Sequence, residues 1–300
     1  MKITGTFLDE ITYDIPAANW GPREWAREFD TMKSIGIDTV ILIRAGLKNR
    51  MTFDSKVLKS YATMMPADED LVDIFLKEAE RCRMDFFFGT YDSDRYWRNG
   101  DYNKEMEINL KFTEEAVQRY GRYPAFKGWY ISLEMIKLEQ KAIDLYFKLA
   151  AHLKQLKNLP ILVSPVMRGS QDQIDPAKVK EHEQAWDHIF AQVAGKVDLV
   201  AFQDGCVQYL ELPGFLEVTK RLADKYKITL WTNVETFDRG MPIKFPPISW
   251  PCLRYKLEAA KAVGIEKAIT FEFSHFLSPN SIYPAAHNLF QRYKEWIEKG

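Results

Sequence analysis

The sequence has few cysteines, and their spacing pairs none of them. Cys82, Cys206 and Cys252 form an odd set without a CxxC motif, so the sequence implies neither a disulfide framework nor a structural zinc site. No apolar run approaches the roughly 20 residues of a membrane-spanning helix, and we expect no membrane span. With 41 basic and 42 acidic side chains, the chain also lacks the basic surplus of a nucleic-acid-binding protein, and we expect no nucleic-acid partner.

No leader-like pattern of a basic segment followed by an apolar one precedes the first strand-like segment, because the sequence runs into it directly from Met1 and Lys2. We therefore expect the protein to be cytoplasmic, or exported to the periplasm or the cell surface if a signal segment has been removed. Intrinsic disorder is excluded, since 46% of the residues are hydrophobic and 28% are charged.

The chain alternates short apolar runs with longer amphipathic segments from end to end. The strand patterns cover residues 3–8, 39–44, 85–91, 126–134, 160–167, 199–204, 228–235 and 267–273, and the helical patterns cover 22–34, 68–83, 104–120, 138–157, 176–193, 211–226, 250–263 and 284–298. Gly36, Gly121 and Gly264 follow helix ends, where a left-handed residue is expected.

Eight strand–helix units predict an α/β protein with one (β/α)8 TIM barrel domain spanning residues 1–300. About 250 residues suffice for such a barrel, so we expect elaborated loops at the carboxyl ends of the strands. The longest follow the third, fifth and seventh strands. A doubly wound open sheet is the alternative, but no GxGxxG or GxxxxGK[ST] motif follows any strand.

Several common catalytic motifs are absent. No GxSxG elbow indicates serine hydrolysis, and no Gly-rich phosphate site follows the last two strands. His182 and His188 are not spaced to share one helical face, so they do not form a metal pair. We therefore predict no cofactor and no metal ligand.

Acidic residues converge on the carboxyl ends of the predicted strands. In the fourth, seventh and eighth strands, every second residue forms a more polar row, and we expect this row to face the barrel interior. The row contains Tyr130, Ser132 and Glu134 in the fourth strand, Trp231, Asn233 and Glu235 in the seventh, and Thr270, Glu272 and Ser274 in the eighth. Asp204 ends the sixth strand. Because grouped carboxylates repel and lose hydration, at least one should have a raised pKa. One proton-holding acid beside one ionised acid is the arrangement that glycoside hydrolysis requires.

The placement of Glu134 and Glu235 resembles that of the retaining glycoside hydrolase clan of TIM barrels. The resemblance implies that Glu134 is the acid/base and Glu235 the nucleophile. The clan has Asn directly before the strand-four glutamate, where this chain has Leu133. Retention needs carboxyl groups about 5–5.5 Å apart, and inversion about 6.5–9.5 Å. Glu235 is accordingly expected to act as nucleophile or as base.

Four segments also resemble an uncharacterised bacterial family of TIM-barrel proteins of unknown function, found in polysaccharide-degrading bacteria and often exported. They are the runs at residues 129–134, 202–205, 231–237 and 271–279, and the Gln203-Asp204-Gly205 turn is among the most specific. The resemblance spans nearly the whole chain and implies a carbohydrate substrate.

Polar and aromatic residues at the same strand ends are the candidates for binding an oligosaccharide or glycoside. Aromatic rings suit the C–H faces of sugars, and 14% of the chain is aromatic. Arg44 is expected to supply a counter-charge to the acids or to bind an anionic sugar. The predicted substrate-binding residues are Arg44, Tyr91, Asp92, Trp97, Gln203, Asp204, Trp231, Asn233, Glu272 and His275.

Two other functions remain open at this point. Asp204, Glu235, Glu272 and His275 could hold Mg²⁺ or Mn²⁺, as in a metal-dependent sugar isomerase or epimerase. A barrel that binds carbohydrate without turning it over is the third alternative.

Overall fold

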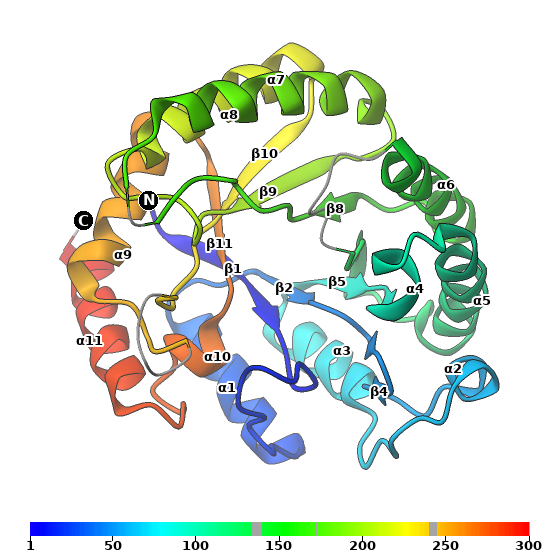
Figure 1. Ribbon diagram of the computed structural model, residues 1–300. Coiled ribbons are helices and arrows are strands. Elements are labelled where there is room, and N and C mark those ends of the chain that lie inside the picture. The colour runs from blue at the N-terminus through cyan, green and yellow to red at the C-terminus, as the bar shows by residue number, and fades with distance from the viewer. Residues whose placement is uncertain (134–139, 172, 240–244, 300) are drawn as a thin grey trace.

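Eight parallel strands close into a barrel, in the order β1-β11-β10-β9-β8-β7-β5-β2 (Figure 1). The structure, a computed structural model, describes residues 1–133, 140–171, 173–239 and 245–299. The barrel strands are β1 (Ile3–Leu8), β2 (Thr39–Leu42), β5 (Asp85–Gly89), β7 (Phe126–Tyr130), β8 (Ile161–Val163), β9 (Leu199–Gln203), β10 (Thr229–Asn233) and β11 (Lys267–Thr270). The predicted (β/α)8 fold is confirmed.

A ring of helices surrounds the barrel (Figure 1). Its members are α1 (Pro22–Ser34), α3 (Leu71–Cys82), α5 (Tyr102–Tyr120), α6 (Gln140–Leu156), α7 (Pro176–Val193), α8 (Leu212–Tyr226), α9 (Trp250–Ala262) and α11 (Pro284–Lys299). Neighbours in the ring pack on each other, for example α1 on α3 and α7 on α8. None of the helices in the described part of the chain combines the length and the apolar character that crossing a bilayer requires.

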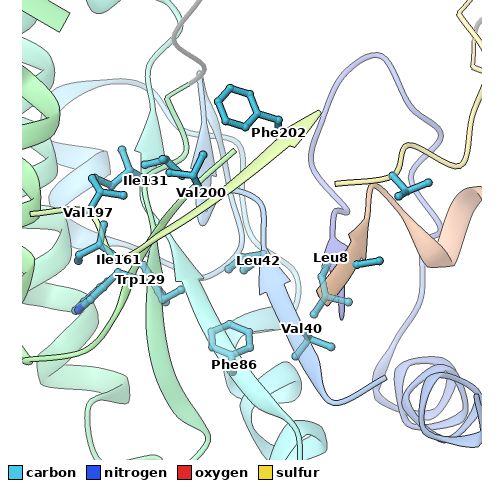
Figure 2. Close-up of a cluster of buried hydrophobic side chains, with 14 of the residues drawn as sticks. Leu8, Val40, Leu42, Phe86, Trp129, Ile131, Ile161, Val197, Val200 and Phe202 are labelled. Carbon is cyan, nitrogen blue, oxygen red and sulfur yellow. The ribbon is translucent and has the colours of Figure 1, made fainter. Parts of the chain in front are cut away.

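Alternation of side chains along the strands builds two apolar layers. One face of each strand packs under the helices, where Figure 2 shows Val40, Leu42 and Trp129 in one buried cluster. The other face fills the barrel itself with a separate cluster that includes Phe7, Tyr130 and Ile269. The body of the barrel is therefore solid, and polar chemistry is confined to its ends.

Further short elements lie among the loops that follow the barrel strands. Strand β3 (Gly46–Leu47) pairs antiparallel with β4 (Arg50–Met51) and parallel with β6 (Tyr91–Asp92). The short helices are α2 (Lys56–Tyr61), α4 (Arg95–Arg98) and α10 (Phe273–Phe276). The small sheet joins the loops after β2 and β5 into one wall.

Candidate active site

A cavity of about 230 Å³ opens at the carboxyl end of the barrel. This is the end at which barrel enzymes carry their chemistry. Aromatic rings and polar side chains from the ends of several strands share the wall, and the residues used below are Phe7, Arg44, Tyr130, Gln203, Asn233, Glu235, Phe237, Arg239 and Phe271.

Glu235 lies two residues beyond the end of β10 and is 1% exposed. Arg239, four residues further along the chain, binds both of its carboxylate oxygens: Nε donates to Oε2 at 3.1 Å and a terminal guanidinium nitrogen donates to Oε1 at 2.7 Å. Burial raises the pKa of Glu235, and the Arg239 guanidinium opposes that shift. A two-point contact of this kind fixes the plane of the carboxylate on the cavity wall.

Asp204 and Lys256 form an ion pair behind Glu235. Lys256 Nζ donates to Asp204 Oδ1 at 2.8 Å, and their side chains are 4% and 1% exposed. The same Asp204 oxygen accepts the backbone N–H of Glu235 at 3.0 Å. Burial raises the pKa of Asp204, and the Lys256 ammonium opposes the shift. Asp204 therefore binds the peptide of Glu235 and is not among the residues that line the cavity.

Ser164, just after β8, orients the amides of Gln203 and Asn233. Gln203 Nε2 donates to the Ser164 carbonyl at 2.7 Å. The Ser164 hydroxyl donates to the Ala201 carbonyl at 2.6 Å, so its oxygen can only accept from Asn233 Nδ2, which lies 3.0 Å away. Asn233 Oδ1 must then point elsewhere, and no donor in the described residues reaches it.

Arg44 lines the cavity beyond the end of β2. Its guanidinium acts on Asp9, a fully buried acid that follows β1: burial raises the pKa of Asp9, and Arg44 opposes that shift. The arrangement matches the expected role of Arg44 as a counter-charge.

Tyr91, Asp92 and Trp97 lie outside the wall of the cavity in the described structure. Asp92 Oδ1 accepts the Trp97 indole N–H at 2.7 Å, and the Tyr91 hydroxyl donates to the Lys48 carbonyl at 2.8 Å. These hydrogen bonds connect the loop after β5 to the small sheet.

Trp231 faces the barrel interior, as its parity predicts, and packs edge-on against Phe87 at 6.0 Å between ring centroids. It pairs in register with Lys267, the first residue of β11. Trp231 therefore fills the barrel below the cavity and is not part of its wall.

The parity interpretation of the eighth strand was wrong. Ile269 and Phe271 belong to the interior cluster, so Glu272 does not follow the inward row. Instead Glu272 caps α10, accepting the backbone N–H groups of Ser274 at 2.9 Å and His275 at 2.8 Å. Its carboxylate also contacts the His275 ring. Burial lowers the pKa of His275, but the negative charges of Glu272, Asp9 and Glu10 together outweigh this and raise it to about 9.

The four residues of the predicted alternative metal set are not gathered into one site. Asp204 pairs with Lys256, Glu235 with Arg239, and Glu272 with His275. In the ranges that the structure describes, no group of three or more His, Cys, Asp or Glu side chains is placed to share a cation.

Glu134 lies outside the described residues, so its distance from Glu235 stays a prediction. Tyr130, four residues before it, lines the cavity. The cavity thus brings together Arg44, Gln203, Asn233 and Glu235 of the predicted residues, whereas Tyr91, Asp92, Trp97, Asp204, Trp231, Glu272 and His275 do not line it.

Sequence reasoning missed the polar side chains Ser164, Arg239 and Lys256 and the phenylalanine rings of the cavity wall. Arg239 had a usable signal, because it is a cation four residues after a strand-end acid. Lys256 had a weaker one, a lysine on the helix face that also carries Leu253, Leu257 and Ala260, all buried. Nothing in the sequence singles out Ser164.

Several solved structures with a similar fold are glycoside hydrolases by name. An endo-1,4-beta-D-mannanase from Thermotoga petrophila RKU-1 is similar with a TM-score of 0.67 and 11% identity over 100% of both chains. A GH2 beta-galacturonidase from Eisenbergiella tayi has a TM-score of 0.62 and 10% identity, over 98% of this chain and 51% of its own. Both likenesses show that the chain shares the (β/α)8 fold of these enzymes.

The chain belongs to the DUF4434 family, a domain of unknown function, whose model matches residues 3–283. It is 48% identical to a "putative alpha-L-fucosidase" from Bacteroides thetaiotaomicron VPI-5482, with a TM-score of 0.93 over 99% of this chain and 93% of that one. A search of curated proteins finds no match.

Proposed function

We propose that this protein hydrolyses glycosidic bonds, with Glu235 as nucleophile or base and Glu134 as general acid. The observation that carries the proposal is the Glu235 carboxylate, buried on the wall of a cavity at the carboxyl end of the barrel and held at both oxygens by Arg239. A carboxylate held in this way is fixed in one orientation on the cavity wall, and the Arg239 guanidinium favours its ionised form against the opposing effect of burial.

In the proposed reaction, Glu134 donates a proton to the leaving glycosidic oxygen while Glu235 attacks the anomeric carbon. Water then releases the sugar from the glycosyl-enzyme, and Glu134 takes up the proton that the water loses. If the carboxyl groups are too far apart for attack, Glu235 instead removes a proton from a water that attacks directly, and the configuration inverts. The anomer formed first, read by NMR, separates the two courses.

The remaining wall suits a sugar. Phe7, Phe237 and Phe271 offer apolar ring faces. Asn233 Oδ1 is an acceptor without a donor in the described residues, and a sugar hydroxyl is a donor of the kind that it lacks.

The test is a panel of aryl and natural glycosides that begins with α-L-fucosides, the class named for the relative that is 48% identical. Glu235→Gln should lower kcat on every substrate by on the order of 10⁴-fold or more, as loss of a nucleophile does. Glu134→Gln should abolish cleavage of natural substrates but spare activated aryl glycosides, whose leaving groups need no proton.

Glu105→Gln is the matched control, because Glu105 is as buried as Glu235 but does not line the cavity. It should keep full activity. Full turnover of a natural substrate by Glu235→Gln or Glu134→Gln would refute the assignment. Activity that a chelator abolishes would instead favour the isomerase or epimerase class, and ligand binding with no turnover would favour a carbohydrate-binding protein.

A further inference from the structure

Lys256 is a charged residue in an apolar position. It lies in the middle of α9, on the face that carries the fully buried Leu253 and Leu257, and it is itself 4% exposed. Removing an ammonium group from water is costly unless the group is paired and hydrogen-bonded. The contacts of Lys256 therefore indicate what compensates that cost.

Within the described residues, both hydrogen bonds of Lys256 lead to Glu235. Lys256 Nζ donates to the Glu235 carbonyl at 3.1 Å and to Asp204 Oδ1 at 2.8 Å. That Asp204 oxygen in turn accepts the Glu235 N–H at 3.0 Å. The ion pair thus binds both the backbone N–H and the backbone C=O of Glu235, the residue that carries the carboxylate on the cavity wall.

On the β11 side, hydrogen bonds of the ladder type still hold the neighbours of Glu235: the Val234 and Thr236 N–H groups donate to the Ile269 and Phe271 carbonyls at 2.9 and 3.1 Å. On the β9 side the ladder ends at Asn233, two residues before Glu235. On that side, the Asp204–Lys256 pair takes the place of the ladder hydrogen bonds that would otherwise fix the backbone of Glu235. It joins the end of β9 and the middle of α9 to that peptide.

We propose that Asp204 and Lys256 are positioning residues, which hold the Glu235 backbone so that Arg239 and the cavity receive its carboxylate in one orientation. This inference rests on the proposed function, and it names what keeps the reacting carboxylate in place. A displacement of about 1 Å is enough to reduce catalysis by about 10²-fold.

A merely structural ion pair between α9 and the barrel makes different predictions. The charged groups acting on Glu235 include Arg239, Asp204 and Lys256, and in the pKa of Glu235 the charge of Asp204 opposes that of Lys256. Removing one partner therefore moves this pKa in a defined direction. Removing both Asp204 and Lys256 takes away the hydrogen bonds to the Glu235 backbone but leaves the local charge balanced.

The experiment uses Asp204→Asn, Lys256→Met and, as the double variant, Asp204→Leu with Lys256→Met, because an Asn at position 204 would still accept the Glu235 N–H. The double variant replaces a buried ion pair by neutral side chains of similar shape, which proteins commonly tolerate, so it remains informative if Lys256→Met alone fails to fold. Lys154→Met is the control. It breaks a pair of the same chemistry, Lys154 with Asp198, at residues that do not line the cavity.

We expect the double variant to lose kcat by on the order of 10²-fold with little change in KM, and the control to lose none. In Asp204→Asn the acidic limb of the profile of kcat/KM against pH should move to lower pH, since a neighbouring negative charge is gone. In Lys256→Met it should move to higher pH. Full kcat in the double variant, or unmoved limbs in both single variants, would overturn the inference.

A carboxyl titration by NMR keeps this test separate from that of the proposed function. The Glu235 signal in ¹³C-glutamate-labelled protein is assigned by its loss in Glu235→Gln. If the protein cleaves no glycoside, opposite movements of the Glu235 pKa in the two single variants still support the contacts argued here, and unmoved values refute them.

Discussion

Gly205 leaves the space that the Glu235 carboxylate occupies. A Cβ at this position would lie 1.5 Å from Glu235 Oε2 and 2.9 Å from Arg239 Nε. Neither atom can yield without breaking the two-point contact between Arg239 and the carboxylate. The glycine of the Gln203-Asp204-Gly205 turn is thus explained by steric room beside the candidate nucleophile.

Gly205→Ala should therefore lower kcat by on the order of 10²-fold or more, because the methyl group displaces the carboxylate from its place. The free energy of unfolding should change by much less than the change in activation free energy that corresponds to the loss of kcat. Steady-state kinetics and urea unfolding on the same preparation check both expectations. Gly214→Ala is the matched control, since its Cβ would have no neighbour nearer than 3.6 Å; an equal loss of activity in both variants would contradict this account.

At the level of single residues, the sequence located the site better than it assigned the roles. Parity correctly put Asn233 and Glu235 on the same cavity. It could not show that Asp204 turns toward a buried lysine, because Lys256 comes from a helix 52 residues further along the chain. Contacts between an acid at a strand end and a distant helix depend on packing, and local alternation does not encode packing.

The barrel strands and the surrounding helices were all predicted from periodicity. Their ends were less accurate: the strand predicted over 126–134 ends at Tyr130, and the one over 160–167 covers only Ile161–Val163. Apolar runs continue past the last paired residue, because loop residues at the mouth of a barrel are also buried. Two-residue strands such as β3 and β4 carry no periodic signal and were missed.

The eighth strand shows why polar parity failed there. The barrel interior is apolar along most of its length, so Ile269 rather than Thr270 faces inward. The Thr270 hydroxyl is satisfied by the Val234 carbonyl at 2.6 Å. The strand then ends at Thr270, and alternation no longer governs where Glu272 points.

The predicted left-handed conformation after helix ends is found at two of the three glycines. Gly36 and Gly264 adopt the predicted left-handed conformation, with φ of 89° and 79°. Gly121 does not, with φ of −60°. It is needed for space, since a Cβ there would lie 2.5 Å from the Val117 carbonyl oxygen. Arg83 and Lys227 adopt the left-handed conformation without being glycine, because their helices α3 and α8 must turn at those points.

Lys227→Gly should stabilise the protein. The left-handed conformation of Lys227, at φ 56°, costs a residue with a Cβ roughly 1–2 kcal/mol, partly offset by the greater freedom of glycine in the unfolded chain. We expect a gain of about 0.5–1 kcal/mol in the free energy of unfolding, measured by urea denaturation. Lys225→Gly, inside the last turn of α8, should destabilise instead; stabilisation in neither position would show that the backbone at Lys227 is unstrained.

Across the whole molecule, buried carboxyl groups outside the cavity set a common response to pH. Burial raises the pKa of Glu10, Glu28 and Glu105 to about 7 in each case. They lie in the loop after β1, in α1 and in α5, so the effect belongs to the scaffold and not to the candidate site. A folded protein with such groups holds protons that the unfolded chain releases at lower pH.

These pKa shifts determine in which direction the free energy of unfolding changes with pH. Because the folded pKa lies above the unfolded one, the stabilising contribution is complete below about pH 4.5 and is lost as the pH rises through 7. Glu28 is fully buried, and its shift from 4.5 to about 7 corresponds to about 3 kcal/mol at 1.4 kcal/mol per unit. Ser278 Oγ and Asn280 Nδ2 donate to one of its oxygens, at 2.8 and 2.7 Å, and a Gln at this position keeps an acceptor for them.

Glu28→Gln should therefore flatten the dependence of stability on pH. Between pH 5 and 8, the free energy of unfolding of the unmodified protein should fall by up to about 3 kcal/mol more than that of the variant. Urea unfolding at each pH measures the difference. Glu295→Gln, on the exposed face of α11, should leave the profile unchanged. Parallel profiles for Glu28→Gln and the unmodified protein would mean that Glu28 is ionised in the fold, with its charge balanced by groups other than Ser278 and Asn280.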